Sequence, residues 1–131
     1  MTPDPAWVAA NIRTGGIPII GRVTCNRVLF PQLRAALLEL VERGLASRIN
    51  SSDYGGCYVP RYIGHDPSKG LSTHTWGIAV DLNVATNQRG TAGQMDPQVV
   101  AVFKKWGFAW GGDWQYTDPM HFELAAIVKP R

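Results

Sequence analysis

The chain has 131 residues, of which 45% are hydrophobic and 18% are charged, and its formal net charge is +3. These values exclude a disordered or fibrous chain, and the length leaves room for one domain over residues 1–131. The apolar runs are too short to cross a bilayer, and the Lys and Arg residues are scattered rather than gathered in a basic stripe. We therefore expect neither a membrane nor a nucleic acid as partner, and we expect a monomer.

The first elements along the chain are two helices with a short strand between them. A helix is expected at Pro5–Ile12, because Asp4 is suited to cap it and its first residue is a proline. A loop rich in Gly and Pro then leads to a strand at Val23–Asn26. The clearest helix is expected at Pro31–Arg43, where apolar residues recur at helical spacing and a glycine follows.

The rest of the chain alternates short strands with one more helix. That helix begins after the capping residue Asp96 and ends before Gly107. The strands are expected at Ala46–Asn50, Ile78–Val84, Phe108–Trp110 and Met120–Leu124. Together these elements predict an α+β fold, in which helices pack on a small, mostly antiparallel sheet.

The two cysteines, Cys25 and Cys57, are too few for a disulfide scaffold and lack the close spacing of thiolate zinc sites. Two unlinked thiols, one disulfide and a metal role all remain open, and we favour unlinked thiols.

Two of the expected strands carry polar residues on one face. Alternation within Ile78–Val84 places Asp81 on the face opposite the apolar residues, and alternation within Met120–Leu124 does the same for His121. Glu123 shares the face of His121. If the two strands are neighbours, Asp81 and His121 point into one cleft.

His74 lies seven residues before Asp81, an odd separation that would place the two on opposite faces of an unbroken strand. The strand must therefore begin after His74, and Gly77 permits the loop that swings the imidazole back over the sheet. A single histidine is more often a hydrogen-bonded core or surface residue than a ligand. Two imidazoles and one carboxylate that converge, however, form a plausible zinc set with a fourth position open for water.

Several motifs occur in a fixed order between Arg61 and Leu124. They are Ser72-x-His74-x-x-Gly77-x-Ala79-x-Asp81, Trp110-Gly111-Gly112-Asp113-Trp114 and Asp118-x-x-His121-Phe122-Glu123. This region resembles the VanY-like zinc D-Ala-D-Ala carboxypeptidases and their relatives, the L-alanyl-D-glutamate endopeptidases of bacteria and phage lysins. The resemblance implies a hedgehog/D-Ala-D-Ala-peptidase-like fold.

The resemblance also implies roles for individual residues. It places Zn²⁺ on His74, Asp81 and His121, and it makes Asp118 the catalytic base, where many relatives use Glu. Arg61 corresponds to an arginine that binds a substrate carboxylate or polarises the scissile carbonyl.

Other residues near these motifs have expected roles of their own. Asp118 precedes Pro119, which favours a turn that brings its carboxylate to the strand entrance. Glu123 competes with Asp118 as the base, but the resemblance favours a supporting hydrogen bond to a metal ligand. Ser72 either bonds the substrate or a ligand or holds its loop, and Trp114 is expected to touch substrate.

Three further residues have ordinary interpretations. His65 has no partner at ligand spacing and is expected to be an exposed loop residue. Trp76 and Trp110 are expected to belong to the core, as aromatic residues of small domains usually do.

The function implied is zinc-dependent hydrolysis of a peptide bond in the stem peptide of peptidoglycan, and we favour an endolysin-like L-alanyl-D-glutamate endopeptidase. A D-alanyl-D-alanine carboxypeptidase remains an alternative. A zinc-containing binding module without catalysis, like hedgehog signalling domains, and a structural zinc domain belong to other classes. The start of the chain shows no signal peptide, so action on the cell wall would require lysin-type release or a longer parent protein.

Overall fold

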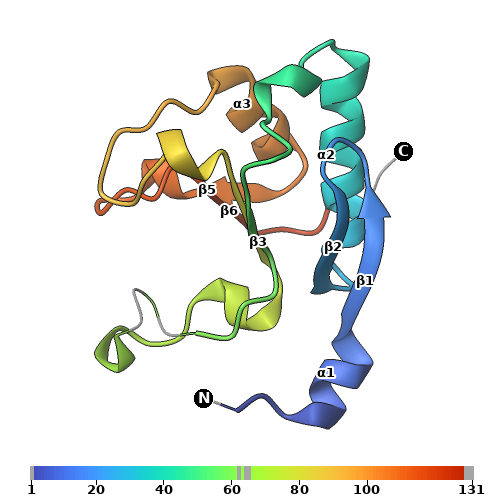
Figure 1. The fold of residues 1–131 in the computed structure, drawn as a ribbon, viewed down its shortest axis with the longest axis vertical. Helices are drawn as coiled ribbons and strands as arrows, with labels where there is room; N and C mark the ends of the chain where they lie inside the picture. Colours follow the sequence, from blue (N-terminus) through green and yellow to red (C-terminus); the bar gives the residue numbers. More distant parts are fainter. Residues whose placement is uncertain (1, 62, 64–65, 129–131) are drawn as a thin grey trace.

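The computed structural model describes residues 2–61, 63 and 66–128 and contains helices and two small sheets (Figure 1). The α-helices are α1 (Pro5–Asn11), α2 (Phe30–Glu42) and α3 (Pro97–Lys105). The strands are β1 (Ile12–Ile17), β2 (Gly21–Asn26), β3 (Tyr54–Gly56), β4 (Ala79–Leu82), β5 (Phe108–Trp110) and β6 (His121–Leu124). Short 3₁₀ helices include η1 (Ala46–Arg48), η3 (Pro67–Lys69), η4 (Thr73–Trp76), η5 (Val84–Thr86) and η6 (Gly111–Asp113). His65 lies outside the described residues.

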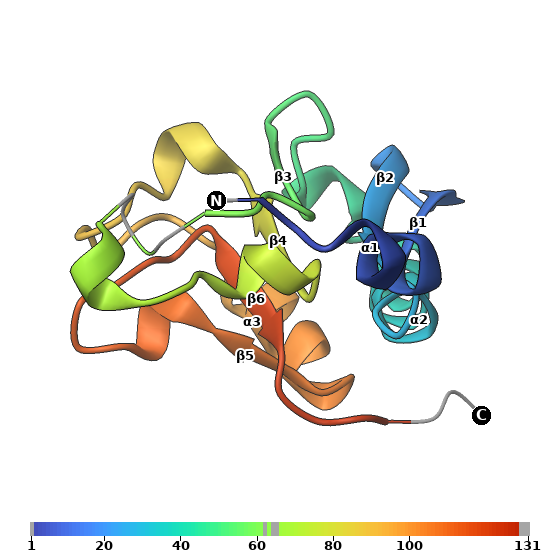
Figure 2. The ribbon, with the colours of Figure 1, turned by 90° about the horizontal axis from the view of Figure 1, so that it is seen from below.

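All strand pairs are antiparallel. β1 and β2 form a hairpin, and the larger sheet has the order β3-β4-β6-β5. The hairpin lies beside α2, on the side of the molecule away from η5 and the loop before α3 (Figures 1 and 2). The predicted α+β class is therefore confirmed.

The core lies between the larger sheet, α2 and α3. Helix α2 buries the face formed by Leu33, Ala36, Leu37 and Leu40, each completely inaccessible to solvent, as its helical spacing predicts. Phe122 of β6 packs against Phe103 of α3, with ring centroids 4.6 Å apart. This packing fixes β6, and with it the residues on the opposite face of that strand.

Two expectations about secondary structure were wrong. The strand expected at Ala46–Asn50 is replaced by η1, because Leu45 and Ile49, four residues apart, both turn into the core. The segment expected to be a loop after α1 contains strand β1. Gly15 and Gly16 have low strand propensity, but pairing with β2 stabilises the strand. The short, glycine-rich β3 was not expected either.

The two cysteines form a disulfide, so the preference for unlinked thiols was wrong. The bond joins Cys25 of β2 to Cys57, which follows β3, and both residues are buried. Their sequence separation of 32 gave no local signal, since only the folded hairpin brings the two Cα atoms to 5.5 Å.

Within the described part of the chain, no helix combines the length and the apolar character that a membrane crossing would require.

Candidate metal centre

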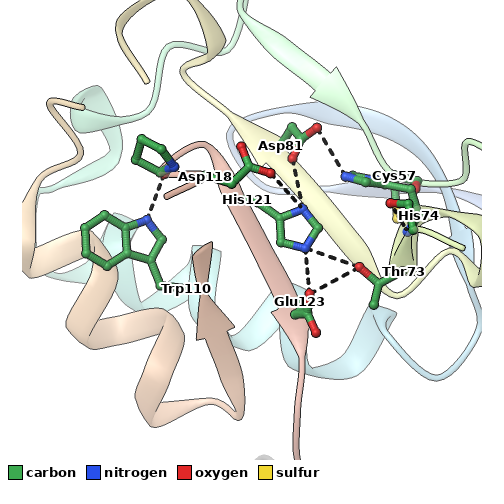
Figure 3. Close-up of polar contacts among 10 residues, drawn as sticks. Cys57, Thr73, His74, Asp81, Trp110, Asp118, His121 and Glu123 are labelled. Atoms are coloured by element: carbon green, nitrogen blue, oxygen red, sulfur yellow. Dashed lines mark hydrogen bonds and ion pairs between the residues drawn. The ribbon is translucent and has the colours of Figure 1, made fainter. Parts of the chain in front are cut away.

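Three buried side chains converge at the larger sheet: His74 from η4, Asp81 from β4 and His121 from β6 (Figure 3). One potential ligand atom from each lies within 4.8 Å of the other two. The structure thus brings together the three residues that the strand pattern and the resemblance had singled out.

The pairing of β4 with β6 accounts for two of these positions. Asp81 lies directly opposite His121 in the antiparallel register, and its Oδ1 atom is 3.3 Å from Nδ1 of His121. Every residue of β4 is buried, and the strand contacts η4. The two side chains are therefore held in a partly desolvated environment.

The turn at η4 positions His74, as its odd spacing from Asp81 predicted. Ser72 caps η4 by accepting a hydrogen bond from the backbone N–H of His74 at 3.3 Å. Gly77 ends it with φ +68°, and a Cβ atom here would come within 2.6 Å of the backbone nitrogen of Asn26. This close approach requires glycine. The turn leaves Nε2 of His74 3.1 Å from Oδ2 of Asp81.

Hydrogen bonds fix which ring nitrogen of each histidine faces the centre. Nδ1 of His74 lies 2.8 Å from the carbonyl oxygen of Cys57, which can only accept, so Nδ1 carries the proton and Nε2 presents its lone pair. Nε2 of His121 lies 2.8 Å from Oε1 of Glu123 and 3.2 Å from Oγ1 of Thr73. The carboxylate assigns the proton to Nε2 and leaves the Nδ1 lone pair facing Asp81.

The described residues leave two atoms of this cluster unsatisfied. Nε2 of His74 and Oδ1 of Asp81 are buried and have no hydrogen-bond partner within the described chain. Buried polar atoms without partners are rare in folded proteins, and a cation between them would satisfy both. Two imidazole nitrogens and a carboxylate oxygen are a donor set that suits zinc. The residues present therefore fit a metal ion.

The charges of the cluster are strongly coupled in the metal-free protein. Burial would raise the pKa of Asp81, but the adjacent rings of His121 and His74 lower it to about 2. Burial would lower the pKa of His121, but the neighbouring carboxylates of Asp81 and Glu123 raise it to about 9. In the metal-free protein, a protonated His121 thus balances part of the negative charge of Asp81 and Glu123, as a bound cation would.

Asp118 stands at the edge of this cluster, in the turn that Pro119 predicted. Its Oδ2 atom is 3.9 Å from Nδ1 of His121, beyond hydrogen-bond distance. The backbone N–H of Asp118 donates to the carbonyl oxygen of Gly111 at 2.8 Å. This bond holds the turn against the Trp110–Trp114 motif. Burial raises the pKa of the Asp118 carboxyl above its usual value.

Glu123 lies on the other side of the His121 ring from Asp118. Burial would raise the pKa of Glu123, but the hydrogen bond from His121 lowers it. Oε1 of Glu123 also accepts a hydrogen bond from Oγ1 of Thr73 at 3.3 Å. Glu123 is thus engaged with the ring nitrogen that faces away from Asp81.

A cleft of about 780 Å³ opens over the cluster. Its lining includes the other residues for which a role was expected, namely Arg61, Ser72, Trp114, Asp118 and Glu123. The Trp114 ring lies 5.0 Å from that of His121 and is 40% exposed. The hydroxyl of Ser72 is already engaged as the cap of η4, which agrees with a role in holding its loop.

Trp110 and Trp76, for which a place in the core was expected, are not among the residues that line the cleft. Trp110 is half-buried against the core, as expected, and its indole N–H donates to the carbonyl oxygen of Pro119 at 2.7 Å. Trp76 is 41% exposed and lines a separate cavity with Trp7, so its expected place in the core was wrong. Trp76 is the last residue of η4, directly before Gly77.

Six residues that line the cleft were not expected from the sequence: Ile63, Leu71, Thr73, Gln88, Arg89 and Met120. Thr73 occupies a variable position of the first motif, and its contact with His121 could not be read from that motif. Gln88 and Arg89 follow η5 in a loop without any motif.

An α+β fold with two histidines and an aspartate at the base of an open cleft has the arrangement of a metallopeptidase. The sequence model of a family described as D-alanyl-D-alanine carboxypeptidase matches residues 66–124. This match confirms the resemblance of this region of the chain to the VanY-like peptidases. It includes the three clustered residues and Asp118, whereas Arg61 lies outside it.

Proposed function

We propose that the protein hydrolyses a peptide bond in the stem peptide of peptidoglycan, with zinc bound by His74, Asp81 and His121. The observation that carries this proposal is the buried cluster with two unsatisfied atoms, which lies below a cleft that also contains Asp118. The family match supports a substrate related to peptidoglycan and therefore action outside the cytoplasm.

The protein's own residues would prepare the site for the reaction. The carbonyl of Cys57 and the carboxylate of Glu123 orient the two imidazoles, so that each presents a lone pair to the ion. When bound, zinc would supply Lewis-acid chemistry, polarising the scissile carbonyl and lowering the pKa of water.

Asp118 would act as general base and then as general acid. It takes a proton from the attacking water and returns it to the amine that leaves. The 3.9 Å between its Oδ2 atom and Nδ1 of His121 supports this role, because the carboxylate lies beside the cluster but makes no hydrogen bond to His121. The raised pKa of this carboxyl, caused by burial, makes it a better proton acceptor than an exposed aspartate.

The cleft would also position the substrate. Arg61 supplies a guanidinium for a substrate carboxylate or for the scissile carbonyl, and Trp114 supplies an exposed ring beside His121. Ser72 supports the site by holding η4, although its position at the cleft also permits contact with substrate.

The preferred reaction is cleavage between L-alanine and D-glutamate, as in an endolysin. A D-alanyl-D-alanine carboxypeptidase is the second candidate, and the description of the matching family favours it. Mass spectrometry of digested stem peptides separates the two, because the endopeptidase releases L-alanine from the rest of the stem and the carboxypeptidase releases terminal D-alanine.

The proposal is tested with purified peptidoglycan and zinc-supplied protein. New amino groups should appear with time, and a chelator should stop their release. A wild-type protein that carries one zinc per chain but releases no amines would contradict the enzymatic proposal and favour a non-catalytic zinc module.

A further inference from the structure

Two arginine side chains line the cleft, Arg61 and Arg89. Among the described residues, no carboxylate lies within 4.0 Å of either guanidinium. Arg43 and Arg48, on other surfaces, do form ion pairs. The two arginines of the cleft therefore keep their charge available to a ligand.

The guanidinium of Arg89 lies over the ring of Tyr116, with its Cζ atom 4.8 Å from the ring centroid. A guanidinium that stacks on an aromatic face keeps its edge N–H groups available for hydrogen bonds. This contact therefore orients the side chain without occupying its donors.

The backbone around Arg89 is fastened to the segment that leads to Asp118. The N–H of Gly90 donates to the carbonyl of Thr117 at 2.6 Å, and the hydroxyl of Thr117 donates to the carbonyl of Thr91 at 2.5 Å. The loop before α3 and the loop before β6 accordingly run side by side at the left of Figure 1. The backbone next to Arg89 is thus tied to the residue before Asp118.

The charge of the cleft favours an anionic group on the ligand. The lining carries the carboxylates of Asp81, Asp118 and Glu123 against the two guanidiniums. A divalent cation in the cluster would leave this lining with a net positive charge. A guanidinium matches a carboxylate in shape as well as charge, because it can donate two parallel hydrogen bonds.

We infer that Arg89 binds a carboxylate of the substrate, so that the protein distinguishes a carboxylate from the corresponding carboxamide. This inference rests on the proposed function, and it adds a residue that lies in no recognised motif. A stem peptide offers two such groups: the α-carboxylate of its D-glutamate and the carboxylate of its terminal D-alanine. The binding chemistry is the same for both.

The test uses three synthetic peptides and calorimetric titration. The parent is L-Ala-γ-D-Glu-L-Lys-D-Ala-D-Ala, the second peptide is amidated at the α-carboxylate of D-glutamate, and the third is amidated at its C-terminus. Each is titrated into zinc-supplied Asp118→Asn protein, which prevents turnover, with Arg89 intact or replaced by alanine. We expect one amidated peptide to bind about tenfold more weakly than the parent when Arg89 is present. We expect this difference to disappear in the Arg89→Ala protein, and the affected peptide identifies the carboxylate.

Arg34→Ala is the matched control, because Arg34 lies over the ring of Phe30 at 5.0 Å but does not line the cleft. It should keep the preference for the carboxylate, and Arg89→Lys should keep part of it. The inference is overturned if the parent does not bind, if both amidated peptides bind as tightly as the parent, or if the preference survives in Arg89→Ala. Hydrolysis is measured separately in protein with Asp118 intact, so a failure of the proposed function remains distinguishable.

Discussion

The imidazole of His74 hydrogen-bonds through Nδ1 to the backbone carbonyl of Cys57, with 2.8 Å between the two atoms. Since Cys57 is itself disulfide-bonded to Cys25 of the hairpin, the metal cluster and the disulfide share one structural support. A covalent bond outside the cleft thereby restrains the carbonyl that orients a proposed metal ligand.

Removal of the disulfide should therefore lower both stability and metal affinity. For a loop defined by a sequence separation of 32, we expect the free energy of unfolding of the metal-free protein to fall by about 3–4 kcal/mol in Cys25→Ala/Cys57→Ala. Urea unfolding in the presence of a chelator measures this change, and reduced wild-type protein is the control. Equal unfolding midpoints for oxidised and reduced wild type would contradict the structural role of the bond.

Replacement of Asp118 should abolish turnover without loss of zinc. Asp118→Asn keeps the size of the side chain but removes its basicity, so we expect the rate of peptide hydrolysis to fall by about 10²–10⁴-fold. Asp118→Glu should retain part of the activity. Zinc content and rate are measured on the same preparations. Full activity of the asparagine variant would assign the base to another residue.

Glu123 should tune the metal site rather than act as the base. Glu123→Gln retains a hydrogen-bonding group but removes the charge beside Nε2 of His121, and we expect zinc affinity to fall by about 10–100-fold. Competition with a chromophoric chelator measures the affinity. At saturating zinc, this variant should recover most of its activity. A variant that binds zinc normally but does not hydrolyse the substrate would instead point to a catalytic role.

Zinc affinity should depend on pH through His121. Because its pKa is raised to about 9 in the metal-free protein, the ring is protonated at pH 7 and must release that proton when the ion binds. Asp81, with a pKa of about 2, is already deprotonated. The affinity should therefore rise with pH up to about 9. Calorimetry at pH 7 in buffers of different ionisation enthalpy counts the released protons, and a count of zero would contradict this coupling.

The positions of Asp81 and His121 could be predicted because strand alternation fixes the face of each residue, and the register of two antiparallel strands then brings them together. His74 could be predicted because its odd spacing from Asp81 required a turn, which Gly77 provides. The face of each strand residue and the turn at Gly77 follow from local geometry, whereas the pairing of β4 with β6 is a tertiary contact. The structure contains the predicted positions of Asp81 and His121 and the predicted turn at Gly77.

Features that arise from tertiary contacts could not be predicted in the same way. Arg89 reaches the cleft because hydrogen bonds join its loop to the segment around Thr117, and no periodicity reports such bonds. The Cys25–Cys57 disulfide depends on where the hairpin packs. Strand β1 was hidden because its glycines have low strand propensity, which cross-strand pairing overrides.

The most direct test of the central claim is the metal content of purified protein after dialysis, measured by mass spectrometry for the wild type, Asp81→Asn and Asp113→Asn. Asp113 is the matched control, because its carboxylate is exposed and paired with Lys104 at 2.6 Å. The proposal predicts one zinc ion per chain in the wild type and in Asp113→Asn, and little or none in Asp81→Asn. Equal zinc in all three proteins, or none in the wild type supplied with zinc, would contradict it.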